Sequence, residues 1–318
     1  MPESLRRRRD DVESAWPHRL AIVTTGATFL LILAGGLVTN TGAGLAVPDW
    51  PTTFGYNMFL YPWSRMVGGI FYEHSHRLIG SAVGLLTLTL TLVLWAVEPR
   101  RWVRRLGSAA LLAVITQGVL GGLRVVLLQD TLAIVHGALA QAFFGLTAAL
   151  ALFTSREWKE EVRPLSREGS GHLFRLAAFT TGGIYLQLVV GALLTHVGAR
   201  LDAHLLLATL ITILVPNLAA RILTRHADRS GLVRPAILLC GLLVLQLLLG
   251  LGSYVHRFAS LDLPLVSFLG LALPVSHRLT GGLMLITSLV VTLRVHRLLG
   301  SPTPAGYRDR VPGRGVPA

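Results

Sequence analysis

The sequence has only one cysteine, Cys240, and one lysine, Lys159, among its 318 residues. A lone cysteine forms no intramolecular disulfide and supplies no cysteine cluster for a zinc site. Cys240 lies inside an apolar run, so we interpret it as a small buried hydrophobic residue. Charge is scarce as well. Asp, Glu, Lys and Arg together make up 14% of the chain, which is too little to cover the surface of a soluble domain of this length.

Long apolar runs take the place of the missing charge. Hydrophobic residues make up 52% of the chain, and its mean hydropathy is +0.60. A helix that spans a bilayer needs about 20 mostly apolar residues, and runs this long and continuous are helical. The predicted fold class is an all-α integral membrane protein with eight transmembrane helices, over residues 19–40, 74–97, 104–126, 131–153, 173–195, 203–223, 234–254 and 273–298. The first run lacks a convincing cleavage pattern, so we interpret it as a span and not as a removed signal peptide.

The positive charges predict how the helices are oriented. The chain carries a formal net charge of +13, but its arginines lie in short bursts between apolar runs, which argues against a nucleic-acid partner. Of the 29 basic residues, 23 fall before the first span, after the eighth, or beside the connections between spans two and three, four and five, and six and seven. Cytoplasmic segments carry such an excess. We therefore predict a multi-pass protein of a bacterial-type cell membrane with both termini in the cytoplasm.

The two halves of the sequence resemble each other. Residues 35–43 at the end of span one match residues 191–199 at the end of span five at five positions, and Gln117–Gly121 in span three matches Gln246–Gly250 in span seven. This pattern predicts two four-helix units of the same orientation, a parallel repeat. The expected parts are a cytoplasmic tail (1–18), a first unit (19–155), a cytoplasmic linker (156–172), a second unit (173–298) and a cytoplasmic tail (299–318).

The longest outer connection runs from about Thr41 to Tyr72. A loop of this length is usually functional or folded against the rest of the protein. Its Trp and Tyr residues are also suited to a simpler role as anchors at the membrane interface.

Four histidines share one depth in the predicted bundle. Each lies a few residues inside the outer end of an even-numbered span: His76, His136, His204 and His277. Ionisable groups inside a membrane are costly and usually face the bundle interior with a function there. One such histidine could be a hydrogen-bonded core residue, but four at equivalent positions favour a role as metal ligands.

The surroundings of these histidines favour haem iron over other metals. Zinc or copper needs a third or fourth ligand, and only Glu73, Asp130 and Asp202 are nearby carboxylates. Haem iron needs one or two axial ligands, which two facing helices can supply. We predict the pairs His76 with His136 and His204 with His277. A small residue follows each histidine by four positions and leaves space for a macrocycle, although small residues are also common at membrane helix contacts; these are Gly80, Ala140, Ala208 and Gly281.

The segment Glu73-His74-Ser75-His76-Arg77 distinguishes the first pair from the second. A carboxylate one turn from a ligand can orient it, relay a proton or stabilise positive charge. Span eight repeats Ser-His-Arg at 276–278, with no acid before it. The asymmetry predicts one catalytic and one accessory pocket. The alternatives are that Glu73 forms a simple ion pair with Arg77, and that Arg77 and Arg278 extend to the interface instead of pairing with haem propionates.

These motifs resemble the haem A synthase family of cytochrome oxidase assembly. The matching pieces are Gly35–Leu45 with Pro48–Pro51, Glu73–Arg77, Gln117–Gly122, His136–Gly137, Thr195–His196, His204 and Ser276–Arg278. The resemblance implies an oxidoreductase that converts haem O to haem A by oxidising the C8 methyl group to a formyl group through successive hydroxylations.

The resemblance also implies roles for individual residues. His204 and His277 would be the iron ligands of a haem b cofactor, and His76 and His136 would hold the substrate haem O, with Glu73 as the essential carboxylate. Arg77, Arg278 and His196 would contact propionates or support the ligands. Expected partners are haem O, membrane lipid, a haem O synthase and an electron donor. Some bacterial members carry a cysteine pair in the first outer loop. This chain has none there, so a thiol step cannot operate in it.

Two other functions also fit four membrane histidines. A dihaem b-type electron-transfer cytochrome would use both pairs equally, but it gives no reason for Glu73 on one side only. A transporter could line a proton path with histidines, and such a protein would be colourless.

Overall fold

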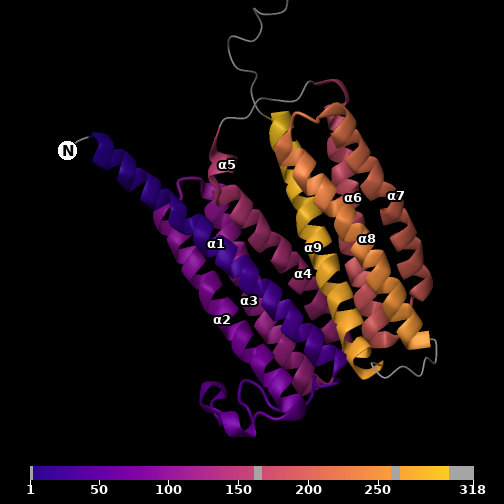
Figure 1. Ribbon diagram of the computed structural model, residues 1–318. Coiled ribbons are helices and arrows are strands. Elements are labelled where there is room, and N and C mark those ends of the chain that lie inside the picture. Colours follow the sequence, from indigo (N-terminus) through magenta and orange to yellow (C-terminus); the bar gives the residue numbers. More distant parts are fainter. Residues whose placement is uncertain (1–2, 161–166, 259–265, 301–318) are drawn as a thin grey trace, which may run out of the picture.

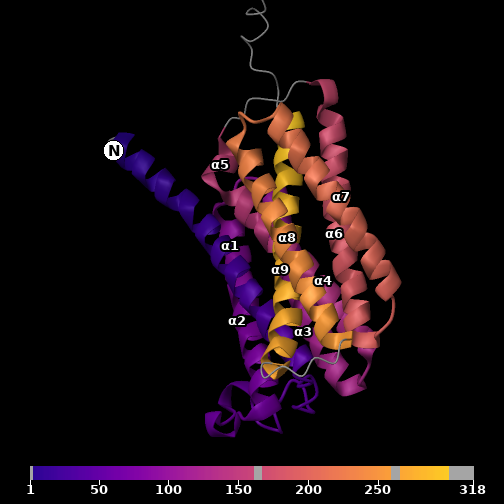
Figure 2. The same ribbon diagram turned by 45° about the vertical axis from the view of Figure 1, so that its right-hand side comes forward.

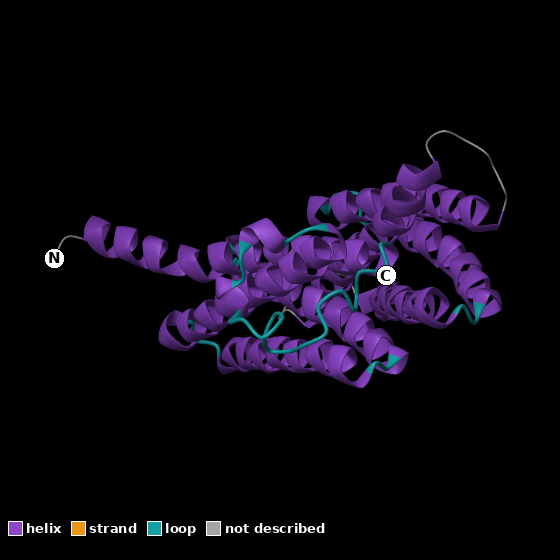
Figure 3. Cartoon of the chain, turned by 90° about the horizontal axis from the view of Figure 1, so that it is seen from below, coloured by secondary structure: helices purple, strands orange, loops and turns teal. Residues whose placement is uncertain are grey.

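The computed structural model describes residues 3–160, 167–258 and 266–300. Within these ranges the chain is helical and forms no β-strand beyond an isolated bridge between Thr53 and Tyr56 (Figures 1 and 3). The middle of the predicted linker, 161–166, and nearly all of the predicted tail, 301–318, lie outside the described residues.

Eight long helices account for most of the chain. They are α1 (Glu3–Asn40), α2 (Gly68–Val97), α3 (Arg101–Leu127), α4 (Asp130–Thr154), α6 (Arg167–Val197), α7 (Leu201–Arg225), α8 (Ser230–Phe258) and α9 (Val266–Gly300). Three short helices accompany them: η1 (Met58–Leu60), η2 (Trp63–Arg65) and α5 (Arg156–Lys159). Each long helix contains a segment long and apolar enough to cross a membrane. The prediction of an all-α integral membrane protein with eight transmembrane helices is confirmed.

Several helices extend beyond their predicted apolar windows. The backbone of α1 is already helical at Glu3, inside the predicted tail, and α2 begins at Gly68, six residues before the predicted start at 74. The predicted window, 74–97, left out the first turns of α2 because Gly68, Gly69 and the charged Glu73 interrupt the apolar pattern there. In the structure Glu73 is paired with Arg77 and with the backbone of the preceding loop, so the helix includes it.

The long helices form two groups of four. In the first, α1 packs on α2 and α4, and α3 packs on the same two helices; in the second, α6 packs on α7 and α9, and α8 packs on the same two. Contacts of α4 with α6, of α1 with α9, and of α4 with α9 join the groups. The spans of α4 and α9 are 61% and 50% buried, more than any other span. These two helices therefore form the centre of the molecule (Figures 1 and 2).

Side chains follow the environment that a bilayer offers. Buried clusters inside each group contain leucine, valine and alanine together with Phe143, while large apolar side chains such as Leu85, Leu112 and Leu206 are more than 60% exposed. In lipid such exposure carries no penalty. Many threonine hydroxyls, including those of Thr28 and Thr87, donate to the carbonyl four residues earlier, which satisfies a polar group without water.

Residues 41–67 connect α1 to α2 and lie at one end of the bundle, which we call the loop end (Figure 1). Helices α2, α4, α7 and α9 begin at this end, and α1, α3, α6 and α8 finish there. The loop end is the side predicted from the charges to be outside the cell.

Candidate functional site

The structure brings the four predicted histidines together in the predicted pairs. The ring centroids of His76 on α2 and His136 on α4 are 6.4 Å apart, at an interplanar angle of 77°. Those of His204 on α7 and His277 on α9 are 6.2 Å apart, at 61°. Each pair lies inside one group of four helices, so each group contains one candidate site.

Both pairs lie at the loop end. Every one of the four histidines falls within the first three turns of its membrane span, since those spans begin at Gly68, Asp130, Leu201 and Phe268. The rings are mostly removed from solvent and lipid by neighbouring helices. The two sites therefore have the same depth.

Each imidazole rests on a glycine of the neighbouring helix. A Cβ atom on the glycine would lie 3.1 Å from Cε1 of His76 at Gly35, 3.3 Å from that of His136 at Gly121, 3.4 Å from that of His204 at Gly191, and 2.9 Å from that of His277 at Gly250. Such distances leave little or no room for a side chain. Because glycine has no side chain, the backbone of the neighbouring helix can lie directly against each ring.

At three of these four contacts, the residue one turn before the glycine is a glutamine whose side chain also contacts the histidine. The side-chain amide of Gln117 donates to the carbonyl oxygen of His136 at 3.0 Å, and that of Gln187 donates to the carbonyl oxygen of His204 at 3.0 Å. The amides of Gln187 and Gln246 also lie 3.3 Å from Nε2 of His204 and of His277. Nδ1 of His277 donates to the carbonyl oxygen of Gln246 at 3.1 Å. The sequence pattern had shown two of these glutamines without indicating their partners.

The geometry of both pairs fits one metal ion held by two imidazoles. Two metal–nitrogen bonds of about 2 Å each span about 4 Å. The remainder of the centroid separations, 6.4 and 6.2 Å, is taken up by the distances from the two ring centroids to their ligating nitrogens. No group of three or more His, Cys, Asp or Glu side chains able to hold a metal ion occurs among the described residues. Two ligands without a third suit haem iron, whose other four ligands come from the porphyrin, and not zinc.

Glu73 and Arg77 form a buried ion pair near the first site. Their side chains are 5% and 9% exposed, and Nη2 of Arg77 lies 2.7 Å from Oε1 of Glu73. The other carboxylate oxygen of Glu73 accepts a hydrogen bond from the backbone amide of Val47 at 2.9 Å. The ion pair that we considered as an alternative to a catalytic role is therefore present, and it joins α2 to the long loop.

Arg77 also donates to three backbone carbonyls of this loop. Nη1 donates to those of Asp49 at 2.7 Å and Thr52 at 3.0 Å, and Nη2 donates to that of Val47 at 3.0 Å. With the bond to Glu73, all four hydrogens on its two Nη atoms have partners. This arrangement favours Arg77 as an anchor of the loop over Arg77 as a propionate partner.

Further side chains hold the loop against the first four helices. Nδ1 of His74, a residue that is 1% exposed, lies 3.1 Å from the hydroxyl of Thr53. Arg124 on α3 donates to the carbonyl of Gly44 at 2.9 Å. The indole of Trp50 lies so close to Gly122 that a Cβ there would overlap it. The sequence does not single out His74, because its partner is set by the fold of a loop that has no periodic pattern.

Asp49 organises the tip of the loop. Its carboxylate accepts hydrogen bonds from the backbone amides of Phe54 at 2.7 Å and Gly55 at 2.8 Å, and from the hydroxyl of Thr52. Burial by itself would raise the pKa of Asp49, but these hydrogen bonds outweigh it and place the pKa below its ordinary value.

The remaining predicted residues lie where the two groups of helices meet. Nη1 of Arg278 on α9 lies 3.4 Å from the hydroxyl of Thr39 on α1. His196 on α6 interacts electrostatically with Arg278 and Arg124. The structure thus brings Arg278 and His196 toward each other, whereas Arg77 lies with the loop.

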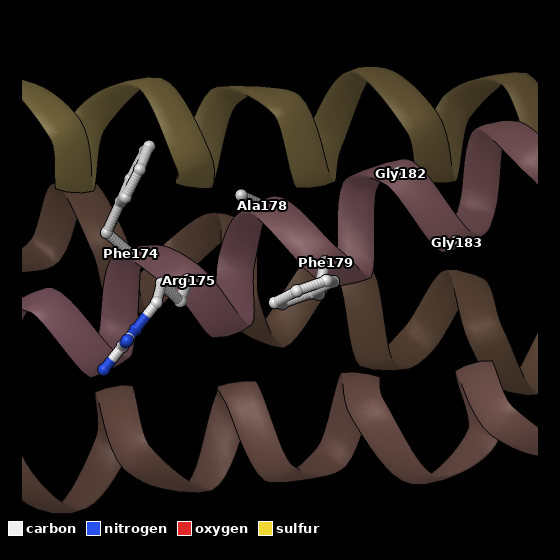
Figure 4. A pocket seen from close by; sticks show the side chains of 6 residues that line it. All are labelled: Phe174, Arg175, Ala178, Phe179, Gly182 and Gly183. Atoms are coloured by element: carbon white, nitrogen blue, oxygen red, sulfur yellow. The ribbon is translucent and has the colours of Figure 1, made fainter.

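A separate groove runs along α6 and contains none of the predicted site residues. Figure 4 shows its lining side chains, which all belong to α6: Phe174, Arg175, Ala178, Phe179, Gly182 and Gly183. The groove is apolar and lies on the half of α6 away from the loop end, so it is no part of the histidine sites.

Comparison with known proteins decides the family. A family profile described as COX15-CtaA, cytochrome oxidase assembly protein, matches residues 18–203, more than half of the chain. The chain belongs to this family. The matched range includes Glu73, His76, His136 and His196 and ends one residue before His204.

Several curated relatives carry the name heme A synthase. That of Shouchella clausii is 30% identical over 189 residues, which are 58% of this chain and 60% of the relative. That of Alkalihalophilus pseudofirmus is 30% identical over 130 residues, 40% of each chain. That of Bacillus pumilus is 27% identical over 191 residues, 57% of this chain and 59% of the relative. The aligned part of the chain thus spans about 60% or less of the length of these relatives.

The glycine contacts give a first testable prediction. Gly250→Ala should push the ring of His277 and destabilise the protein by about 1–3 kcal/mol, the usual cost of overpacking. Gly241→Ala on the same helix meets nothing within 4 Å and should stabilise it by up to about 1 kcal/mol, as Gly→Ala does in helices. Thermal unfolding of both variants in detergent measures the difference. Equal melting temperatures would show that the ring does not depend on Gly250.

The hydrogen bonds of Asp49 at the loop tip give a second testable prediction. Asp49→Ala removes three hydrogen bonds and should loosen the loop by about 2 kcal/mol, while Ser64→Ala, at an exposed position, should not. Limited proteolysis of the loop at neutral pH measures this. Because the pKa of Asp49 is lowered, its contribution is complete above its ordinary pKa and is lost as the pH falls through the lower folded value. Wild-type resistance should therefore persist down to about pH 4. Loss of resistance at pH 6 would contradict the assignment.

Proposed function

We propose that the chain is a haem A synthase, which oxidises the C8 methyl group of haem O to a formyl group through successive hydroxylations. The observation that supports this most directly is the His76–His136 pair, at a separation suited to haem iron, in a chain of the cytochrome oxidase assembly family. The curated relatives named heme A synthase support the same activity.

We assign the two pairs to different haems. His204 and His277 would hold a resident haem b, and His76 and His136 would hold the haem O substrate. Haem iron, when bound, supplies one-electron and oxygen chemistry that no amino-acid side chain supplies. The protein's own contribution would be to hold each haem with one pair of imidazoles and to exclude water from both sites by the surrounding helices.

The proposed difference between the two sites rests on Glu73. No acidic residue precedes His277 at the corresponding distance, and Glu73 is a buried carboxylate within one turn of His76. We assign to it the handling of a proton or of developing positive charge during oxidation. The ion pair with Arg77 and the hydrogen bond from Val47 fix where this carboxylate lies.

We also propose that the two groups of helices are a parallel repeat, comprising residues 19–155 and 173–298. Every contact within α1–α4 has a counterpart within α6–α9, and the glycine–histidine contacts occur at matching helices. Between the repeats, Arg278 and His196 are suited to bind propionates, because both carry or can carry positive charge where the groups meet. A haem O synthase and an electron donor are the expected partners.

A comparison of two variants tests the role of Glu73. Glu73→Gln keeps the shape of the side chain and an oxygen that can accept from Val47, but removes the charge. In cells that co-express a haem O synthase, it should reduce haem A by at least about tenfold, measured in extracted haems, while the loop keeps its protease resistance. Asp49→Ala separates the role of Glu73 in holding the loop from its role in the reaction, because this variant loosens the loop and leaves the Glu73 carboxylate in place. Full conversion by Glu73→Gln would remove Glu73 from the chemistry, and absence of haem A from wild-type cells would refute the proposed function.

The proposed orientation, with both termini in the cytoplasm, is testable because the chain has one cysteine. In a Cys240→Ser background, Ser64→Cys at the loop end and Lys159→Cys at the opposite end introduce single thiols at exposed positions. A membrane-impermeant maleimide applied to intact cells should label only the first. Labelling of only the second would reverse the topology and place both histidine pairs near the cytoplasm.

A further inference from the structure

The boundary between α2 and α3, which we call the α2–α3 seam, is closed at the loop end by the loop and not by the helices themselves. Near the opposite end the two helices touch directly: Thr91 donates to the carbonyl of Gly107 at 2.9 Å, and the indole of Trp95 donates to the hydroxyl of Ser108 at 3.0 Å. Glu73 lies five turns before Thr91 on the same face of α2. At this end, however, the face binds the backbone of the loop.

Residues 44–52 of the loop form a wedge between the two helices. On the α2 side, their backbone is held by the buried ion pair of that helix through the hydrogen bonds described above. On the α3 side, the wedge accepts one hydrogen bond from Arg124, and the indole of Trp50 lies directly against the backbone of Gly122. The wedge is therefore bonded mainly to α2, and it meets α3 largely through one apolar side chain.

The wedge lies at the depth of the first histidine pair. Gly122, which meets the indole, directly follows Gly121, which meets the ring of His136. Arg77, which binds backbone carbonyls on both sides of the indole, directly follows His76. Each histidine of the pair is thus one residue away from a contact with the wedge, or rests on a residue that is. The wedge therefore closes the first site on this side.

The α2–α3 seam lies on the side of the first group that faces lipid. The second group packs against α1 and α4. At the depth of the histidines, the boundary of α1 with α2 is closed by the ring of His76, and that of α3 with α4 by the ring of His136. On α2 and α3, Leu85 and Leu112 are more than 60% exposed, as expected of side chains that contact lipid. The seam is therefore the side from which a molecule dissolved in the bilayer would reach the first site.

The corresponding seam of the second group, between α7 and α8, has no such wedge among the described residues. The connection from α6 to α7 is only three residues long, Gly198–Arg200. No residue of 201–210 on α7 or of 244–257 on α8 is buried. A resident group has to enter its site once, whereas a substrate enters and its product leaves in every turnover. Of the two sites, the one proposed to exchange its contents is the one with a closure.

We propose that the α2–α3 seam is a lateral entrance through which a porphyrin passes between the bilayer and the first site, and that Trp50 is its gate. The inference rests on the proposed function for the identity of the porphyrin. The indole of Trp50 is a flat apolar group suited to contact a porphyrin, and it is still 38% exposed. It meets α3 at a glycine, which has no side chain to oppose its movement. Because the backbone on either side is bound to α2, the entrance opens by movement of one side chain and not by unfolding of the loop.

The rates of haem uptake and loss by the purified full-length protein in lipid nanodiscs test the entrance. Protein that carries its resident haem is mixed with iron protoporphyrin IX, and the absorbance change that is missing in His136→Ala is assigned to the first site. Loss is followed by transfer of this haem to apomyoglobin. Trp50→Ala should speed uptake and loss about tenfold, as for a barrier lowered by about 1.4 kcal/mol. Trp63→Ala removes an indole of the same loop that is 77% exposed and should leave both rates unchanged.

A second variant keeps the proposal testable if Trp50→Ala does not fold. The methyl group of Gly122→Ala would overlap the indole, so it should displace Trp50 from the seam and speed exchange in the same way. Gly118→Ala, one turn earlier on α3, meets nothing within 4 Å and is the matched control. Unchanged rates in either folded variant, Trp50→Ala or Gly122→Ala, would overturn the proposal.

A third variant distinguishes the gate from general mobility of the loop. Asp49→Ala loosens the loop tip but leaves the indole in place, since Arg77 binds backbone carbonyls, and its rates should stay close to those of the wild type. Acceleration equal to that of Trp50→Ala would show that loop mobility sets the rate, and the proposed gate would be wrong. Absence of first-site uptake in the wild type would instead refute the proposed function, from which this inference takes its ligand.

Discussion

The contact between an imidazole edge and a glycine backbone is the constraint on which the rest of the structure depends. It occurs four times, once for each histidine, and always between adjacent helices of one group. Because a glycine has no side chain, the neighbouring helix can come close enough to fix where the ring lies. The similar separations of the two pairs, 6.4 and 6.2 Å, follow from this repeated contact. A bundle with larger residues at these positions would have to spread apart, and the two rings of each pair could no longer lie as close together.

The first group of helices adds a second device, a buried ion pair with every Nη hydrogen and both carboxylate oxygens in use. On its own, such a pair would add little to the stability of the fold, because removing two charges from water costs about as much free energy as their attraction returns. Here Glu73 and Arg77 also bind the backbone of the loop. The pair therefore has a structural role that its helical spacing alone does not indicate. The same carboxylate serves loop and chemistry in our proposal, which couples the cover of the site to its reactive group.

Much of the architecture could be predicted from the sequence because a membrane imposes simple rules. The eight helices follow from the length of the apolar runs, and the histidine pairs follow from their equal depth on alternate helices. The start of α2 was predicted six residues too late, because Gly68, Gly69 and the charged Glu73 interrupt the apolar pattern and the partners of Glu73 are set by the fold. The roles of His74 and Asp49 depend on the fold of residues 41–67, which has no period. Likewise, Gln117 and Gln246 stood out as a repeat, but their partners only became known once α3 and α4, and α8 and α9, were seen side by side.

The equal depth of the two histidine pairs has an electrical consequence. All four rings lie near the same end of their helices, so an electron that passed between the two proposed haems would travel roughly parallel to the membrane plane. Moving a charge across the bilayer would exchange about 2.3 kcal/mol per 100 mV with the transmembrane potential, but lateral movement exchanges almost none. Electron exchange between two such haems would therefore be nearly insensitive to the voltage across the membrane.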